Sequence, residues 1–169
     1  TFHRYLPKTH KASLELLENS QENIIRIFPM FPQFSYATTG SIALFFQKNL
    51  SKKTLQKLRW ITSYPDDPEF ILSYQRKITT YIENSGISEE NWLLFFSAHG
   101  VPQHFVCGGD PYEKECKKSY HAITKAFPKA HSRLCFQSKF GPGKWLHPYT
   151  GDAAKNVLHW NKGRKEVLF

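Results

Sequence analysis

The sequence has no apolar stretch long enough to cross a bilayer, and it has few cysteines. Its longest apolar runs are short and bounded by charged or polar residues, as at 92–96, whereas a membrane-spanning helix needs about 20 predominantly apolar residues. The three cysteines, Cys107, Cys116 and Cys135, are odd in number and lack the paired spacing of zinc or redox motifs. We therefore expect reduced thiols and a cytoplasmic protein, with peripheral contact to the inner membrane left open.

Acidic residues are the scarcer charged class. The chain has 14 Asp and Glu against 23 Lys and Arg, and its formal net charge of +9 favours partners such as nucleic acid, anionic lipid or a carboxylate-bearing small molecule. The basic residues are spread along the chain without a run longer than a pair such as Lys52-Lys53, and the aromatic residues fall on apolar faces instead of alternating with them. We therefore expect no nucleic-acid partner.

The sequence contains alternating signals for helices and strands. Asp67-Pro68 is typical of a helix start, and Gly86 is typical of a helix end. The run Leu93-Leu94-Phe95-Phe96 is typical of a strand that helices cover on both faces. The expected helices are 9–18, 40–50, 68–85, 111–127 and 152–160, and the expected strands are 24–28, 58–61, 93–96, 133–137 and 167–169. This alternation predicts an open, mostly parallel α/β sheet, with 51–54 as a polar connector.

The unusual residues follow the expected strands. In open parallel sheets ligands bind outside the carboxyl ends of the strands, so the loops after Phe28, Ile61, Phe96, Phe136 and Phe169 should share one face. Three of these loops, 29–35, 97–102 and 137–145, hold the chemically interesting side chains. The fifth loop lies beyond the sequence, which looks truncated after its last apolar strand.

Four short motifs in these loops resemble those of the ferrochelatase family. They are Ser97-Ala98-His99-Gly100-Val101-Pro102 followed by Gly109-Asp110-Pro111-Tyr112, Pro32-Gln33-Phe34-Ser35 with Thr38-Thr39-Gly40-Ser41, Gln137-Ser138-Lys139, and Gly141-Pro142 with Trp145-Leu146. The resemblance implies a chelatase-like α/β fold with two Rossmann-like lobes, each with a parallel sheet, and the porphyrin in the cleft between them. Only part of this fold is expected here, with residues 1–50 as the end of the first lobe and 51–169 as a second lobe incomplete at its C-terminus.

The resemblance also implies a reaction. Ferrochelatases are lyases that insert Fe²⁺ into protoporphyrin IX to form protoheme, the terminal step of heme biosynthesis. The expected partners are porphyrin and ferrous iron, with iron as substrate and no permanently bound cofactor. Coproporphyrin as the substrate, or a non-catalytic porphyrin-binding remnant of the fold, stay open as alternatives. Tyr36 occupies the position where iron-sulfur versions place a cysteine, so we expect no iron-sulfur cluster in this part of the enzyme.

His99 is the expected catalytic residue. A neutral imidazole can accept a pyrrole proton near neutral pH or ligate a borderline metal, and both roles, catalytic base and metal ligand, stay open for His99. Proton acceptance is favoured, because a lone histidine makes a weak iron site. The Ser97 and His99 pair does not indicate a serine hydrolase, since the G-x-S-x-G turn is absent.

The resemblance implies a porphyrin pocket around His99. Its expected substrate-binding residues are Ser35, Trp145, Gln137, Ser138 and Lys139. Ser35 could instead cap a helix, and Lys139 and Arg4 could attract porphyrin propionates or be solvated charges. Ser35, His99 and Trp145 should surround one cleft, since each follows the end of a strand. The 169-residue chain alone is expected not to insert metal into porphyrin, because family members carry an acidic residue in the fifth loop, which this sequence does not include.

Overall fold

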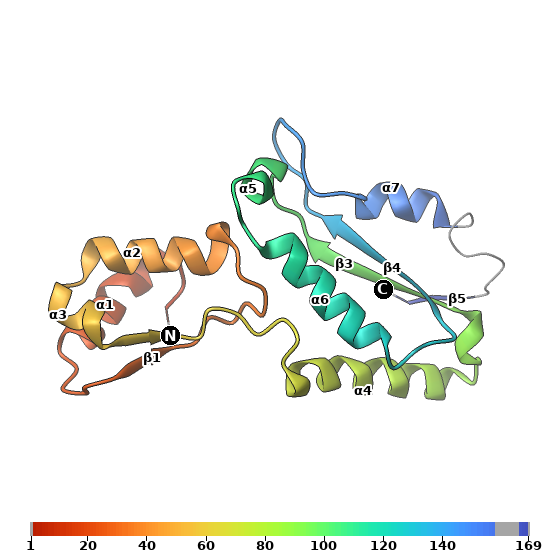
Figure 1. Cartoon of the computed structure of the whole chain (residues 1–169), viewed down its shortest axis with the longest axis horizontal. Helices are drawn as coiled ribbons and strands as arrows, with labels where there is room; N and C mark the ends of the chain where they lie inside the picture. Colours follow the sequence, from red (N-terminus) through yellow and green to blue (C-terminus); the bar gives the residue numbers. More distant parts are fainter. Residues whose placement is uncertain (1, 158–165, 169) are drawn as a thin grey trace. The chain divides into compact units, whose positions relative to one another are not determined.

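The chain forms two compact units, Thr1–Tyr64 (unit 1) and Pro65–Phe169 (unit 2), which are drawn in Figure 1. This computed structural model describes residues 2–157 and 166–168. Among these residues, no helix is both long enough and apolar enough to span a membrane.

Unit 1 is a small α/β unit built on a pair of parallel strands. Its elements are η1 (Pro7–Thr9), α1 (His10–Glu18), β1 (Ile25–Ile27), the π-helical turn η2 (Tyr36–Gly40), α2 (Ser41–Asn49), α3 (Lys52–Lys57) and β2 (Leu58–Trp60). In the parallel register Ile25 lies opposite Leu58 and Ile27 opposite Trp60. Phe46, Leu50 and Leu58 form the buried core. The expected helices at 9–18 and 40–50 and the strands at 24–28 and 58–61 are confirmed to within a few residues at each end.

The expected connector at 51–54 is wrong, because these residues begin helix α3. The Ser51 hydroxyl accepts a hydrogen bond from the Thr54 backbone N–H and caps the helix. The Glu18 carboxylate at the end of α1 accepts hydrogen bonds from the hydroxyls of Thr54 and Ser51 and from the Ser51 N–H. These hydrogen bonds lower the pKa of Glu18, and the bond from the Thr54 hydroxyl has the largest effect. The polar run is therefore a cap that ties α1 to α3.

The strands belong to separate sheets. Among the described residues there is a two-stranded sheet, β1-β2, in unit 1 and a three-stranded sheet in unit 2. Two parallel sheets agree with the expected α/β fold class. Placing the strand at 58–61 in one sheet with the strand at 93–96 is wrong, because β2 pairs with β1. Because β2 pairs with β1, the first compact unit extends to Tyr64 and does not end at residue 50. The assignment of 1–50 and 51–169 to two lobes of the enzyme stays a prediction.

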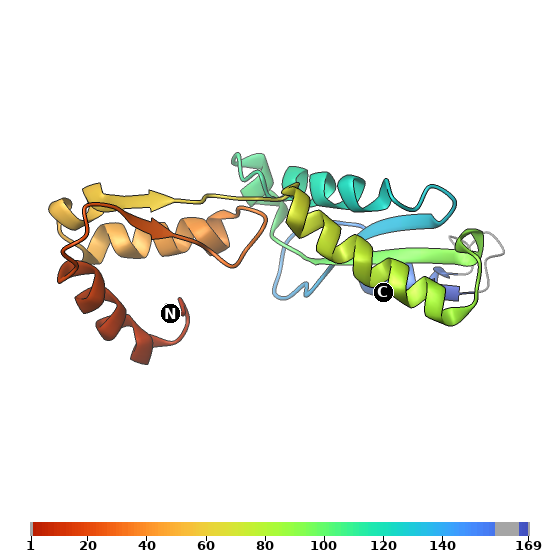
Figure 2. The same ribbon diagram turned by 90° about the horizontal axis from the view of Figure 1, so that it is seen from below.

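Unit 2 is a parallel sheet with helices along it, as Figures 1 and 2 show. Its elements are α4 (Pro68–Ser85), η3 (Glu89–Asn91), β3 (Trp92–His99), α5 (Gln103–Cys107), α6 (Tyr112–Thr124), β4 (His131–Gln137), α7 (Thr150–Lys155) and β5 (Glu166–Leu168). The strand order is β4-β3-β5, all parallel. The expected strand after residue 166 is thus confirmed beside β3 over its described residues. The expected helix end near 160 and Phe169 lie outside the described residues.

The central strand β3 is covered on both faces, as its continuous apolar run predicts. Leu94 is 1% exposed and packs with α4 and α6 residues, including Ile71 and Ile123. Leu93 and Phe95 point to the opposite face and pack with Ala153 of α7. Each such side chain contributes about 1.5–3 kcal/mol of burial free energy before entropy is counted. β3 is therefore a rigid support for the residues at its end.

Helix α4 begins and ends where the sequence indicates. The Asp67 carboxylate accepts hydrogen bonds from the N–H groups of Glu69 and Phe70, both at 3.1 Å, and Pro68 occupies the first turn. Gly86 ends the helix with a φ of 66°, a left-handed conformation that glycine adopts without strain. These two signals make α4 the longest helix described.

Candidate active site

His99 is the last residue of β3, and its side chain is exposed. The preceding strand residues from Trp92 to Phe95 are buried, so exposure begins where the sheet ends. In the register His99 lies opposite Gln137, the last residue of β4. A buried strand thus holds one imidazole at the carboxyl edge of the sheet, the position expected from the sequence.

The loop after His99 lies against the end of β4. The Gly100 N–H donates a 2.7 Å hydrogen bond to the Gln137 carbonyl. A Cβ added at Gly100 would lie 2.8 Å from that carbonyl oxygen and 3.6 Å from a ring carbon of Trp145. Glycine therefore permits a close approach that brings the His99 loop, Gln137 and Trp145 together.

Backbone hydrogen bonds join the His99 loop to the Trp145 segment. Pro102 and Trp145 form an antiparallel bridge, and the Leu146 N–H donates to the Val101 carbonyl at 3.0 Å. Trp145 is 6% exposed, and its ring lies 4.9 Å from that of Phe140. Within the described part of the chain, its buried indole N–H has no hydrogen-bond partner. The structure therefore places Trp145 beside the His99 loop, and its role in substrate binding stays a prediction.

Gln137, the last residue of β4, forms an exposed rim with Ser138 and Lys139, which follow it. The Gln137 side chain accepts a 3.2 Å hydrogen bond from the Ser97 hydroxyl, and Ser138 has a φ of 64°. The Lys139 ammonium lies 4.7 Å from the centroid of the Tyr149 ring, a cation-π contact. Of the three, Gln137 is bonded to the His99 loop through its carbonyl, and the contact of all three with substrate stays a prediction.

Sequence reasoning missed a hydroxyl pair on the same face of the sheet as His99. The Ser97 and Thr150 hydroxyls are 2.8 Å apart, which joins β3 to the start of α7. Ser97 lies two residues before His99, so their side chains leave the strand on the same face. The alternation along 97–99 signals Ser97, whereas nothing local in the sequence indicates Thr150.

Ser35 belongs to unit 1, where it is completely buried. Its hydroxyl accepts a 3.1 Å hydrogen bond from the Ala37 N–H and caps the turn η2. The helix-cap alternative for Ser35 is therefore confirmed. Its contact with substrate, and its place in one cleft with His99 and Trp145, stay predictions.

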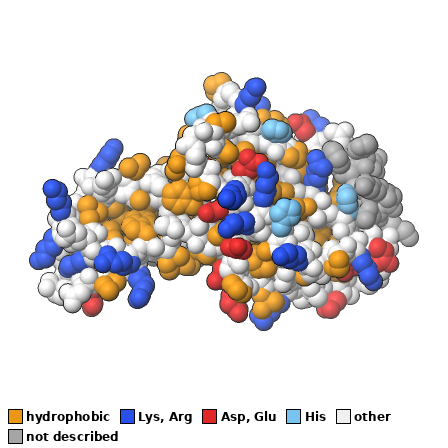
Figure 3. Space-filling model, in the orientation of Figure 1, with side chains coloured by type: hydrophobic (Ala, Val, Ile, Leu, Met, Phe, Trp, Pro, Cys, Tyr) orange, Lys and Arg blue, Asp and Glu red, His pale blue; other side chains and the backbone are white. Residues whose placement is uncertain are grey.

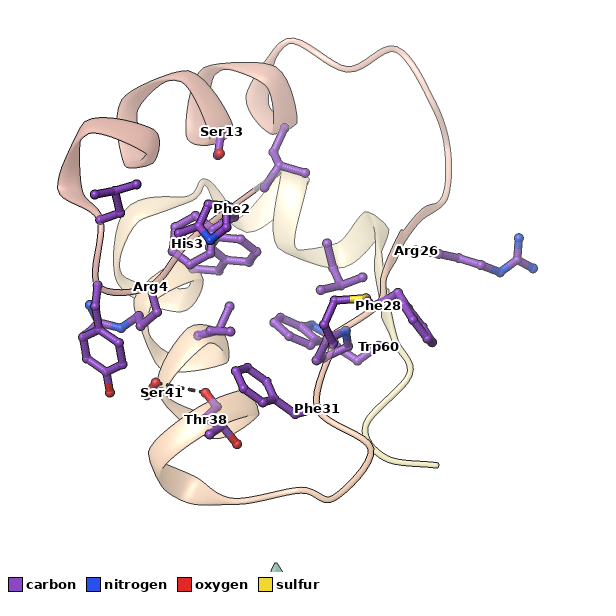
Figure 4. Close-up of a pocket in the computed structure, with 18 of the residues that line it drawn as sticks. Phe2, His3, Arg4, Ser13, Arg26, Phe28, Phe31, Thr38, Ser41 and Trp60 are labelled. Atoms are coloured by element: carbon purple, nitrogen blue, oxygen red, sulfur yellow. Dashed lines mark hydrogen bonds between the residues drawn. The ribbon is translucent and has the colours of Figure 1, made fainter. Parts of the chain in front are cut away.

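Unit 1 contains a pocket of about 750 Å³ at the carboxyl ends of β1 and β2, shown in Figure 4. Its aromatic lining comes from the N-terminal segment, both strand ends and α2, namely Phe2, Phe28, Phe31, Phe46 and Trp60 with Tyr5. Phe31 points into the hollow, whereas Arg26 points away from it. The loop at 29–35 was expected at a ligand site, and the pocket confirms a hollow beside its first residues.

Arg4 lines the same pocket. Its guanidinium lies 5.2 Å from the centroid of the Phe45 ring and 5.6 Å from that of Tyr5. The buried Arg4 Nε has no hydrogen-bond partner among the described residues. An arginine held by ring contacts at an aromatic pocket is suited to bind an acidic substituent of an apolar ligand.

Two further titratable groups near the His99 loop, Asp110 and Cys116, are buried. Asp110 is buried, and its carboxylate accepts a 3.0 Å hydrogen bond from the Tyr112 N–H at the start of α6. Burial raises the pKa of Cys116 to about 12, so this thiol stays protonated. Over the described residues no group of three or more His, Cys, Asp or Glu side chains is arranged to hold a metal ion.

Comparisons with known proteins agree with the motifs. The family model described as Ferrochelatase matches residues 2–169. A ferrochelatase of Chlamydia caviae is 43% identical over 168 residues, which are 99% of this chain and 51% of the relative. A ferrochelatase of Chlamydia pneumoniae is 40% identical over 156 residues, 92% of this chain and 47% of the relative. The chain thus spans about half the length of these relatives, and it belongs to the ferrochelatase family.

Proposed function

We propose that this chain is part of an enzyme that inserts ferrous iron into protoporphyrin IX to form protoheme. The observation that carries the proposal is the exposed imidazole of His99 at the end of a buried parallel strand, joined by its loop to Trp145. The family membership of the chain supports it. Because the chain spans about half of its relatives, the activity is proposed for the complete protein.

The reaction exchanges protons for a metal ion. A free porphyrin loses its two pyrrole protons as Fe²⁺ binds the ring nitrogens, and the products are iron porphyrin and two protons. His99 accepts a pyrrole proton at its imidazole and passes it to water, which its exposed position allows. Iron takes part as a substrate, and no resident cofactor is needed for this exchange.

The unit 1 pocket has the chemistry needed to hold a flat aromatic ring. Its lining of Phe and Trp side chains offers apolar area and ring-ring contact. Arg4 supplies the cation for a propionate, since Arg26, the other lysine or arginine of the lining, points away. An arginine beside an aromatic pocket suits protoporphyrin IX, a flat apolar ring with propionate side chains.

An assay of metal insertion tests the proposal. The complete reading frame that contains this sequence is incubated anaerobically with Fe²⁺ or Zn²⁺ and either porphyrin, and loss of porphyrin fluorescence is followed. We expect turnover with protoporphyrin IX to exceed turnover with coproporphyrin. The 169-residue chain alone is expected to bind porphyrin without turnover. Binding without turnover by the complete protein would instead support the non-catalytic alternative, and a preference for coproporphyrin would reverse the substrate assignment.

A further inference from the structure

Unit 2 contains a second pocket, of about 520 Å³, that the proposed reaction does not use. It is lined by one side of α6, the start of α5, strand β4 and the segment after Trp145. Its lining residues are Gln103, Glu113, Lys117, Tyr120, His121, Leu134, Phe136, Leu146, His147 and Pro148. Its volume is in the range of small-molecule sites.

The walls of this pocket are apolar, and its rim donates hydrogen bonds. Leu134, Phe136, Leu146 and Pro148 form the apolar part. The rim carries the ammonium of Lys117 and the imidazoles of two exposed histidines, His121 and His147. A pocket whose lining combines apolar side chains with cationic and N–H donors is suited to an apolar body that ends in an acid group.

The α6 side of the pocket is part of a wider basic surface. Helical spacing places the exposed residues Lys114, Lys117, Lys118, His121 and Lys125 on one face of α6 and its C-terminal end. Figure 3 shows Lys, Arg and His side chains over this helix, with a smaller number of Asp and Glu side chains among them. This surface raises the local concentration of anions near the pocket.

The acidic residue of the lining does not favour a cationic ligand. The Glu113 carboxylate is already paired with the Lys117 ammonium, which has three donors and keeps two for a further acceptor. A metal ion is also disfavoured, because the described residues hold no suitable group of three ligands. The remaining chemistry is that of an anion.

We propose that this pocket binds an acidic amphiphile, a molecule with one carboxylate or phosphate group on an apolar body. Lys117, His121 and His147 contact the acid group, and Leu134, Phe136 and Leu146 contact the body. This is a second site, separate in its residues from His99, Trp145 and the rim residues 137–139.

The pocket is placed to influence the candidate active site. Phe136 directly precedes Gln137, and Leu146 directly follows Trp145. The lining residue Gln103 donates its backbone N–H to the Lys144 carbonyl at 2.9 Å. This hydrogen bond joins the segment after His99 to the segment before Trp145. A ligand against Phe136 and Leu146 therefore bears on the backbone that holds Gln137 and Trp145.

Titration of the 169-residue chain by ¹H-¹⁵N NMR, without porphyrin or iron, tests the proposal. Octanoate and octyl phosphate carry both features of the ligand, octan-1-ol only the apolar body, and propionate only a small acid. We expect the first two to shift the amides of Phe136 and Leu146 and the indole N–H of Trp145 at concentrations about tenfold lower than the other two. The stronger of the two octyl acids identifies a carboxylate or a phosphate source.

Two substitutions on α6 make the test specific. Lys117→Met should weaken binding of the octyl acid by about tenfold, whereas Lys125→Met, which removes the same charge outside the pocket lining, should change it less than about twofold. Equal binding of octan-1-ol and octanoate, or shifts confined to unit 1, would overturn the proposal, as would equal effects of the two substitutions. Since no catalysis is measured, failure of the proposed function leaves this result unaffected.

Discussion

The two units differ in what they bury and what they expose. In unit 2 the first four residues of the central strand, Trp92 to Phe95, are buried, and exposure increases toward His99 at its end. In unit 1 neither residue at the ends of β1 is fully buried, and large apolar side chains at its pocket stay exposed, including Phe28 at 52% and Met30 at 78%. Unit 2 thus fixes the position of the His99 side chain at a strand end, whereas unit 1 leaves apolar surface exposed at its pocket.

The largest expected effect is a loss of stability in unit 2 on substitution of a buried residue of β3. Leu94→Ala removes a core side chain of β3 and should destabilise unit 2 by about 2–5 kcal/mol through lost burial and a cavity. Hydrogen exchange of the β3 amides measures this change. Leu44→Ala is the control, because Leu44 is exposed on α2. Unchanged exchange in β3 would show that this strand is not the rigid support described.

The second prediction concerns the affinity of the unit 1 pocket for porphyrin. Arg4→Met should weaken porphyrin binding about tenfold, because the pocket lining loses the arginine proposed to bind a propionate. Porphyrin titration followed by quenching of tryptophan fluorescence measures the affinity. Arg26→Met removes the same charge from a side chain that points away, and it should leave the affinity nearly unchanged. Equal losses for both variants would point to a general charge effect.

A smaller effect is expected at the start of α4. Asp67→Ala removes two N-terminal hydrogen bonds and should cost about 1 kcal/mol of unfolding free energy. Asp66→Ala is a matched control, since the Asp66 carboxylate makes only a 3.9 Å ion pair with Lys118 between half-exposed side chains. Urea unfolding of both variants separates the cap from the loss of charge, and equal costs would rule out the cap.

The smallest effect is a pH dependence in unit 1. Hydrogen bonds from Thr54 and Ser51 lower the pKa of Glu18, so its carboxylate adds stability above its unfolded-state pKa. This contribution should be lost as the pH falls through the folded-state pKa. Glu18→Gln should flatten that part of the pH profile of urea unfolding. Glu15→Gln is the control, because Glu15 makes only a 3.8 Å ion pair with Lys11, and it should leave the pH profile unchanged. A pH profile that Glu18→Gln does not change would contradict the assignment to Glu18.

Local signals in the sequence predicted most of the elements and the place of His99. The Asp67-Pro68 cap, the Gly86 stop and the apolar run before His99 each act through nearby residues, and each is found as expected. The pairing of Leu58–Trp60 with Ile25–Ile27, and not with the later strands, could not be predicted, because it depends on contacts distant in sequence. The same holds for the Thr150 hydroxyl beside Ser97 and for Glu18 at the cap of α3. The motif residues gave the family, and the contacts of Trp145 came only from the structure.

The most direct test of the account is metal insertion by His99→Ala in the complete protein. We expect turnover to fall by about 10²–10⁴-fold, the usual contribution of a positioned proton acceptor, with porphyrin affinity and unfolding free energy nearly unchanged. His104→Ala, which removes another exposed histidine from α5, should keep normal turnover. Turnover of His99→Ala within about tenfold of the unsubstituted protein would contradict the catalytic role of His99.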